Sequence, residues 1–146
     1  MSDEQIKDAI RGFLKSTVDG DVTKSLSFLT QDVVWVAPQG TFKGSSEVQK
    51  YLTWMKQITK DSKVTETGIG ILVQGNTAVI EHSLGGTYEG KRWEIPAMCI
   101  YEFRDGKIQN MRSFYDRLSQ AKQVVKGGIS KMAVNSVVNA TVKGLR

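Results

Sequence analysis

The spacing of hydrophobic residues changes near residue 60 and divides the chain into a helical first part and a sheet-forming second part. Before Lys60, apolar residues recur every three to four positions, which is the spacing of a helix with one buried face. After Lys63 the spacing becomes two, which is typical of strands. The pattern predicts helices over residues 3–18, from Val22, and from Ser46 to about Ile58, and strands over Asp32–Val36, 64–74, 77–88, 91–103 and 107–116.

Two of these helices carry the signature of a capping box at their start. Ser2 is followed by Gln5, and Ser46 by Gln49. In this arrangement the serine hydroxyl and the side chain three residues later satisfy free backbone N–H groups of the first turn. We therefore expect the first and third helices to begin at these serines.

Short turns separate the last four strands and predict an antiparallel meander. The strongest turn signal is Asp105-Gly106, because the favoured two-residue turn needs positive φ at both central positions. It places Arg104 opposite Lys107, and a similar turn at Glu89-Gly90 sets the register of the preceding pair. The predicted fold class is therefore α+β, with a curved antiparallel sheet wrapped around the N-terminal helices and a central pocket.

These registers place a largely apolar set of side chains on the interior face of the sheet. The polar exceptions on that face are His82, Asn110, Arg112 and Asp116. Buried polar groups are costly unless they are paired or used, so these four are candidates for function. The opposite face is half apolar, which predicts a homodimer. That face carries Val79, Met98, Ile100, Met111 and Tyr115.

Three of the polar candidates have a structural and a functional interpretation. Asp116 either acts as an acid in the pocket or caps a helix that runs to Lys126. His82 either moves a proton or is a buried histidine held by a backbone carbonyl. Arg112 either binds a ligand carboxylate or extends to the edge of the sheet. The predicted catalytic residues are Asp116 and His82.

The wall of the pocket supplies the remaining candidates. Aromatic side chains on the interior face and on the helices are expected to line it, with Cys99 as a small buried residue beside them. The predicted substrate-binding residues are Trp35, Trp54, Trp93, Cys99, Tyr101, Arg112 and Phe114.

Composition narrows the chemistry further. The single histidine and single cysteine cannot build a familiar zinc site, and neither a phosphate-binding glycine loop nor a Gly-x-Ser-x-Gly motif is present. We therefore expect no metal and no cofactor. The net charge of +5 arises in residues 117–146, which carry six basic and no acidic residues without interleaved aromatic side chains. Because aromatic side chains are missing among these charges, we expect no nucleic-acid binding. We also expect no membrane binding and a cytoplasmic location.

Several of these segments together resemble the nuclear transport factor 2-like superfamily, in its SnoaL-like, polyketide cyclase-related branch. The resemblance covers about residues 3–126. It rests on Asp32-Val33-Val34-Trp35 with Pro38-Gln39-Gly40, on Gly44, on Val79-Ile80-Glu81-His82, and on Phe103 to Ile108 running into Arg112-Ser113-Phe114-Tyr115-Asp116. It implies a cone-shaped fold over residues 1–126, with residues 127–146 as an additional C-terminal helix of the same domain.

The resemblance also implies roles for particular residues. In SnoaL-like cyclases an aspartate at the position of Asp116 is the acid–base residue. The general base of ketosteroid isomerases corresponds to Ala37, and limonene-epoxide hydrolases carry an Arg and an Asp at His82 and Leu84, so neither activity is expected. The predicted function is binding of a small apolar or amphipathic molecule. Whether the protein also carries out acid–base catalysis of the isomerase or cyclase type is left open by the sequence. In that reaction Asp116 abstracts a proton beside a carbonyl, and His82 or Arg112 stabilises the enolate. The alternative is a non-catalytic ligand-binding or dimerisation module.

Overall fold

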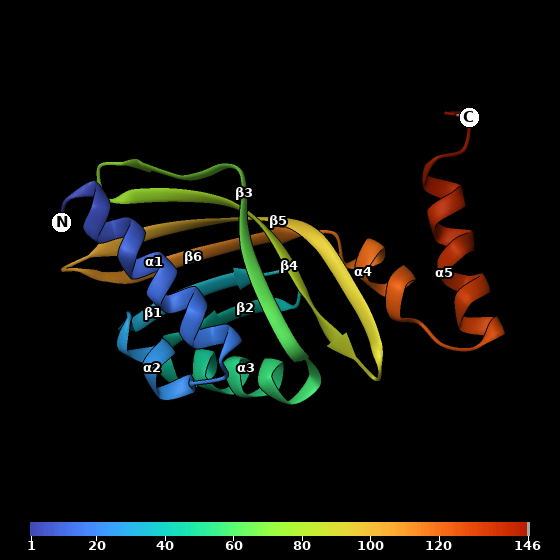
Figure 1. The fold of residues 1–146 in the computed structure, drawn as a ribbon, viewed down its shortest axis with the longest axis horizontal. Coiled ribbons are helices and arrows are strands. Elements are labelled where there is room, and N and C mark those ends of the chain that lie inside the picture. Colours follow the sequence, from blue (N-terminus) through green and yellow to red (C-terminus); the bar gives the residue numbers. More distant parts are fainter. Residues whose placement is uncertain (146) are drawn as a thin grey trace.

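The computed structural model describes residues 1–145 and contains five helices and six strands (Figure 1). The helices are α1 (Asp3–Val18), α2 (Val22–Ser27), α3 (Gly44–Ile58), α4 (Arg117–Val124) and α5 (Gly128–Thr141). The strands are β1 (Leu29–Ala37), β2 (Gly40–Lys43), β3 (Lys60–Gln74), β4 (Thr77–Tyr88), β5 (Lys91–Arg104) and β6 (Lys107–Tyr115).

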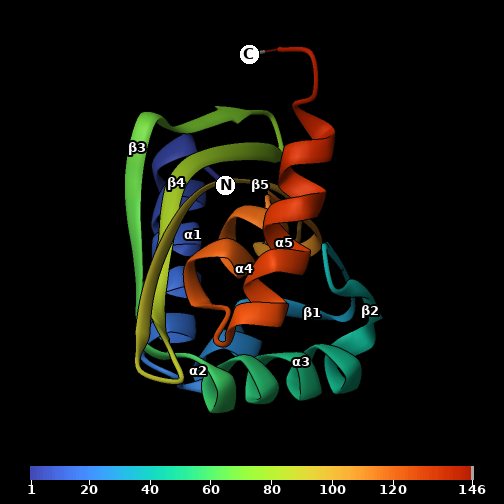
Figure 2. The ribbon, with the colours of Figure 1, turned by 90° about the vertical axis from the view of Figure 1, so that its right-hand side faces the viewer.

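The strands form one curved, open sheet in the order β2-β1-β6-β5-β4-β3. The predicted α+β class, with a curved sheet around the N-terminal helices, is confirmed. One neighbouring pair differs from the antiparallel expectation, because β1 and β6 run parallel. Parallel neighbours need a long crossover, and here β2, α3 and the β3–β5 meander supply it. Figure 2 shows the sheet arching over, with α3 beneath it and α4 at the end nearest the viewer.

The core lies between the concave face of the sheet and the apolar faces of α1 and α3. Ile6, Ile10 and Phe13 of α1 are buried there, as the helical spacing predicts. The predicted capping box at Ser2 and Gln5 is present, with both reciprocal hydrogen bonds formed. Because α1 packs along the concave face, the sheet bends around it and leaves a hollow beside its C-terminal half.

The predicted start of α3 is wrong by two residues. The helix begins at Gly44, and Lys43 stands at the N-cap position without a side-chain cap. The Glu47 carboxylate instead accepts a hydrogen bond of 2.6 Å from the backbone N–H of Lys43. An acidic group in the first turn also interacts favourably with the helix dipole, so it replaces the predicted Ser46–Gln49 box.

A β-bulge in β6 changes which of its side chains face the core. The predicted register holds for β4 and β5, and at the β5–β6 turn Arg104 lies opposite Lys107. The register then shifts, so that Gln109 is an extra residue and Asn110 lies opposite Glu102. One extra residue turns every later side chain to the other face.

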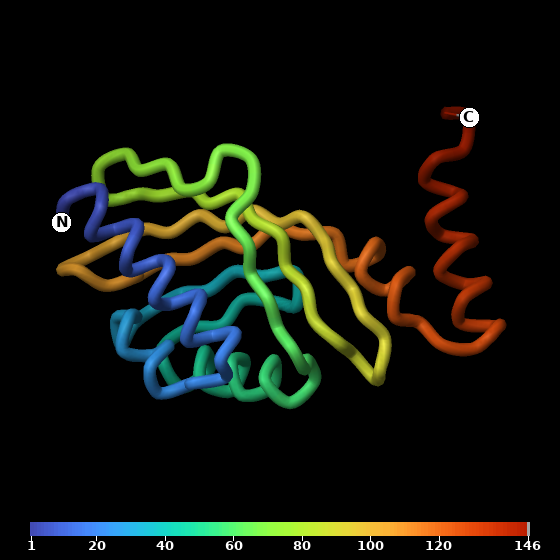
Figure 3. The backbone as a smooth tube through the Cα atoms, viewed as in Figure 1, coloured from blue at the N-terminus to red at the C-terminus, as the bar shows by residue number. Residues whose placement is uncertain are grey.

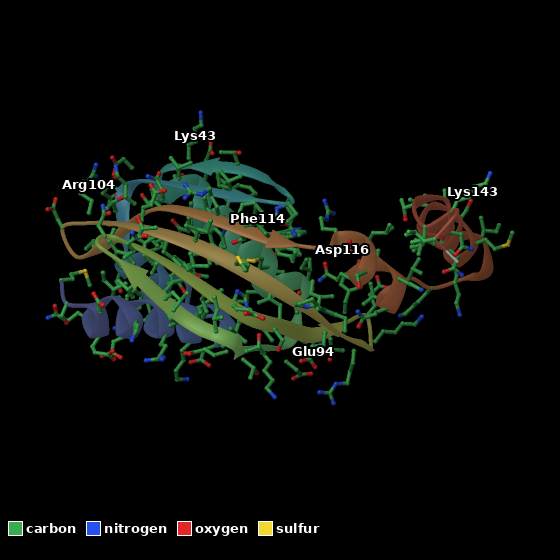
Figure 4. The ribbon with its side chains drawn as sticks, turned by 90° about the horizontal axis from the view of Figure 1, so that it is seen from above. Lys43, Glu94, Arg104, Phe114, Asp116 and Lys143 are labelled. Atoms are coloured by element: carbon green, nitrogen blue, oxygen red, sulfur yellow. The ribbon has the colours of Figure 1, made fainter. Side chains whose placement is uncertain are left out.

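The placement of Asn110, Arg112, Phe114 and Asp116 on the interior face is therefore wrong. Met111 and Ser113 are buried in their place, although they were expected on the outer face. Phe114 is 52% exposed, and Figure 4 shows it on the sheet.

The predicted C-terminal helix is present as α5 and extends away from the body of the domain (Figure 3). Its main contacts are with α4, and none of its side chains is buried. Arg146, the last residue of the predicted extension, lies outside the described residues. Within residues 1–145, the helices are too short or too polar for any of them to cross a bilayer.

Candidate functional site

A cavity of about 700 Å³ lies between the concave face of the sheet and helices α1, α3 and α4. The buried side chains of its wall are mostly aromatic, and Phe13, Trp35, Tyr51 and Tyr101 are among them. Edge-to-face contacts link Phe13 to Trp35 and Trp35 to Tyr51, with ring centroids 5.8 and 5.0 Å apart. Interlocked rings of this kind hold the wall in one shape.

Six of the predicted site residues line this cavity. They are His82, Trp35, Trp54, Trp93, Cys99 and Tyr101. Their positions follow from period-two alternation along β1, β4 and β5 and from the helical spacing of α3. Cys99 and Tyr101 lie two residues apart on β5, and His82 of β4 lies beside Cys99.

The other three predicted residues lie outside the cavity lining. Arg112 forms an ion pair of 2.7 Å with Glu102 on the outer face, and Phe114 is exposed there. Asp116 lies where β6 runs into α4 (Figure 4), and it is the N-cap of that helix. One of its carboxylate oxygens accepts hydrogen bonds from the backbone N–H groups of Leu118 and Ser119, at 2.8 and 3.1 Å.

A chain of hydrogen bonds joins the polar groups at the inner end of the cavity. Trp35 Nε1 donates to Ser113 Oγ at 3.0 Å, and the Cys99 thiol donates to the same oxygen at 3.2 Å. The Cys99 sulfur also lies 3.4 Å from His82 Nε2, and the tautomer of the imidazole decides which of the two atoms donates. His82 Nδ1 has no hydrogen-bond partner within residues 1–145.

Burial keeps both members of the His82–Cys99 pair uncharged near neutral pH. It lowers the pKa of His82 below the ordinary value of 6.5, and a Ser83 backbone group opposes the shift only in part. Burial also raises the pKa of the Cys99 thiol above its ordinary value. A nucleophilic cysteine must be a thiolate, so the pair is unsuited to nucleophilic catalysis. It is suited to proton transfer, with neutral His82 as the acceptor.

A second polar cluster lies where β6 leaves the cavity. The hydroxyls of Tyr51 and Tyr115 both donate to Gln39 Oε1, at 2.9 and 2.7 Å. Burial raises the pKa of Tyr51, so this phenol stays protonated and remains a hydrogen-bond donor. The cluster ties α3, β6 and the β1–β2 turn together at the cavity wall.

Ser113, Tyr115 and Gln39 were missing from the predicted site. A bulge-free β6 placed Ser113 and Tyr115 on the outer face, whereas Gln39 lies in a turn without periodicity. One signal pointed to the bulge: the regular register buried three polar side chains of a single strand. Shifting that strand by one residue exposes Asn110, Arg112 and Asp116, although it also exposes Phe114.

Solved structures of low sequence identity share this fold. A putative polyketide cyclase from Silicibacter is 23% identical, with a TM-score of 0.67, and the match covers 82% of this chain and 94% of that one. An epoxide hydrolase of the limonene-epoxide hydrolase-like type from M. tuberculosis is 17% identical, with a TM-score of 0.72 and coverage of 95% and 96%. A ketosteroid isomerase-like fold protein from Catenulispora acidiphila, solved with trimethylamine, is 17% identical, with a TM-score of 0.73 and coverage of 79% and 90%. No curated protein matches the chain.

The sequence itself carries a family match over most of the domain. The sequence model of the SnoaL-like domain matches residues 10–111, from the middle of α1 to the middle of β6. This span contains β1 to β5, α3 and the His82–Cys99 pair. Because the match covers more than half of the chain, the protein belongs to the SnoaL-like domain family.

Proposed function

We propose that the protein binds a small, largely apolar or amphipathic organic molecule in the cavity beneath the curved sheet. The observation that carries this proposal is an aromatic-lined cavity of about 700 Å³ with a neutral histidine at its inner end. Small-molecule sites are typically apolar pockets with a few placed polar groups. The similarity to a putative polyketide cyclase and an epoxide hydrolase-like enzyme supports a pocket for organic substrates.

We further propose that His82 moves a proton on the bound molecule. The substrate would present a carbon–hydrogen bond next to a carbonyl. A ring nitrogen of neutral His82 would take that proton, while the electron pair of the broken C–H bond moves onto the carbonyl oxygen to form an enolate. The contact of His82 Nε2 with the Cys99 sulfur, at 3.4 Å, orients the ring in the cavity wall. This assigns to His82 the base role that the family resemblance gave to Asp116.

A non-catalytic binding protein is the second candidate, and the position of Asp116 favours it. Its carboxylate is engaged by the first turn of α4 and lies outside the cavity lining. A pocket without that acid still binds an apolar ligand, since burial of apolar surface drives binding. The two candidates differ only in whether a proton is exchanged.

Binding is tested with the neutral fluorescent probe N-phenyl-1-naphthylamine. Ala121 of α4 lines the cavity, so Ala121→Phe should fill part of it and reduce the fluorescence gain and the probe-induced rise in melting temperature. The matched control is Ala133→Phe on exposed α5, which should behave like the wild type. Equal binding by the wild type and Ala121→Phe would reject the cavity as the site.

Proton transfer is tested with 2-tetralone, a bicyclic ketone with acidic hydrogens next to its carbonyl. The wild type in deuterated buffer should accelerate deuterium incorporation at these positions, as followed by proton NMR. His82→Asn should retain tetralone binding and lose the acceleration. Binding without acceleration by the wild type would favour the non-catalytic candidate.

A further inference from the structure

The rim of the cavity is charged, in contrast to its apolar interior. Four basic residues contribute to its lining: Lys56 of α3, Lys60 and Lys63 of β3, and Arg117 of α4. All four are exposed. Two acidic residues share the rim, Asp19 at the end of α1 and Asp61 at the start of β3. The basic groups therefore outnumber the acidic groups around the opening.

The acidic groups do not neutralise this basic rim. Asp19 already forms an ion pair of 2.6 Å with Lys15, which is outside the cavity lining. Within residues 1–145, none of the four basic side chains has a carboxylate within 4 Å. Arg117 makes only a long hydrogen bond of 3.5 Å to the Pro38 carbonyl. The rim thus holds several cations whose charge is available to a ligand.

Lys56 is held in place at the opening by its own stem. A methyl group built on Gly20 would lie 3.1 Å from both Cδ and Cε of Lys56, so the aliphatic part of Lys56 packs over that glycine. Gly20 has a φ of +71°, a backbone conformation that residues with a side chain rarely adopt. The glycine therefore leaves room for the stem of Lys56 to pack against its backbone. The lysine therefore covers the end of α1 with its stem and keeps its ammonium group at the water-exposed rim.

We infer that the ligand is an amphipathic anion, with an apolar or aromatic body in the cavity and a carboxylate or similar oxyanion at the basic rim. This inference rests on the proposed binding function and narrows its ligand class. An apolar interior beneath a basic rim favours a ligand that has an apolar part and an anionic end. The low-dielectric wall also focuses the field of the rim and raises the local concentration of anions.

A matched pair of probes tests the inference on the full-length protein. 8-Anilinonaphthalene-1-sulfonate and N-phenyl-1-naphthylamine share the same aromatic body and differ by one sulfonate. The wild type should bind the sulfonate several-fold more tightly at low ionic strength. This preference should decrease as salt is added, because exposed charges are screened.

Substitutions at the rim should act on the anionic probe alone. The double variant Lys56→Gln, Arg117→Gln should weaken sulfonate binding by roughly two- to fivefold per charge and leave the neutral probe unaffected. The matched control is Lys50→Gln, Lys122→Gln, which removes the same charge from the same two helices outside the cavity lining. The control should bind both probes like the wild type.

Each outcome separates this inference from the proposed function. Equal affinity of the wild type for both probes would overturn the anionic class and leave the apolar site standing. An equal loss of sulfonate binding in the rim and control variants would also overturn it, because net charge alone would then explain the preference. Failure of both probes to bind the wild type would instead reject the binding function on which the inference depends.

Discussion

Asp116 connects the sheet to α4 through its backbone position and its side chain. Its carboxylate accepts two backbone N–H groups that the first turn of α4 would otherwise leave unpaired. The residue is exposed, and its side chain is outside the cavity lining. Its contribution at this position is therefore to the stability of α4, which lines the cavity with Gln120, Ala121 and Val124.

Replacing Asp116 should separate capping from binding. We expect Asp116→Ala to lower the free energy of unfolding by about 1 kcal/mol, because the cap is lost, and Asp116→Asn to change it little. Urea unfolding measures both values. Binding of N-phenyl-1-naphthylamine should be unchanged in the two variants. If Asp116→Asn were as stable as the wild type but lost ketone exchange, Asp116 would be the pocket acid after all.

His82 should make stability depend on pH, because it is the only histidine of the chain and burial lowers its pKa below 6.5. The unfolded state then binds a proton at a higher pH than the folded state, so stability falls as the pH drops below about 6.5. Melting temperatures measured from pH 8 to 5 should show this loss in the wild type. The carboxylates of the wild type and of His82→Asn are the same, so their titration changes both melting temperatures alike. The difference in melting temperature between the two proteins should therefore narrow from pH 8 to 5. A constant difference in melting temperature would show that folding does not change the pKa of His82.

Strand β6 shows how one extra residue determines the composition of the cavity wall. The bulge at Gln109 turns Ser113 inward, where its hydroxyl accepts from Trp35 and from Cys99. It also directs the Tyr115 hydroxyl to Gln39. Without the shift, Asn110 and Arg112 would face the core and Arg112 would lose its partner Glu102. The bulge is thus a condition for the hydrogen-bond chain that ends at His82.

Two single-residue deletions in β6 should differ in their effect. Deleting Gln109 removes the extra residue and keeps Met111, Ser113 and Tyr115 on the interior face, so the protein should fold. Deleting Arg112 turns Ser113 outward and leaves the buried Trp35 N–H without its acceptor, which costs about 1–3 kcal/mol for this group alone. Urea unfolding followed by tryptophan fluorescence should show a clearly lower midpoint for the second deletion. Equal midpoints would contradict the register described for β6.

The whole molecule presents an apolar area on the convex face of its sheet. Val36 of β1, Met98 of β5 and Phe114 of β6 are 41%, 41% and 52% exposed, and Phe114 lies directly opposite Met98. These strands are neighbours, so the three side chains form one patch on the face away from the helices. The homodimer predicted from the half-apolar outer face remains a prediction, and this patch is where we expect its interface.

A charge placed in this patch should dissociate the predicted dimer. Sedimentation velocity should show a dimer for the wild type and a monomer for Phe114→Asp, because a carboxylate cannot be buried there without a partner. The matched control is Ile69→Asp on β3, since Ile69 is 53% exposed outside this patch. The control should remain dimeric. A monomeric wild type at high micromolar concentration would reject the interface.

The sequence by itself was sufficient to predict the helices, the meander and the registers next to its turns. These features depend on local periodicity and turn chemistry, which is why α1, its capping box and the pairing of β4 with β5 agree with the prediction. The inward positions of His82, Cys99 and Tyr101 follow from the same alternation.

Only the tertiary structure decided how β6 fits between β1 and β5. A bulge leaves the alternation of the strand intact on both sides, so its position cannot be read from periodicity. The parallel partner β1 lies far away in sequence, and burial on the concave face selects Met111 and Ser113 over Arg112. The cost of burying unpaired polar groups therefore placed Asp116 at a helix cap. His82 stays as a buried polar side chain of the cavity wall, where we propose the proton transfer.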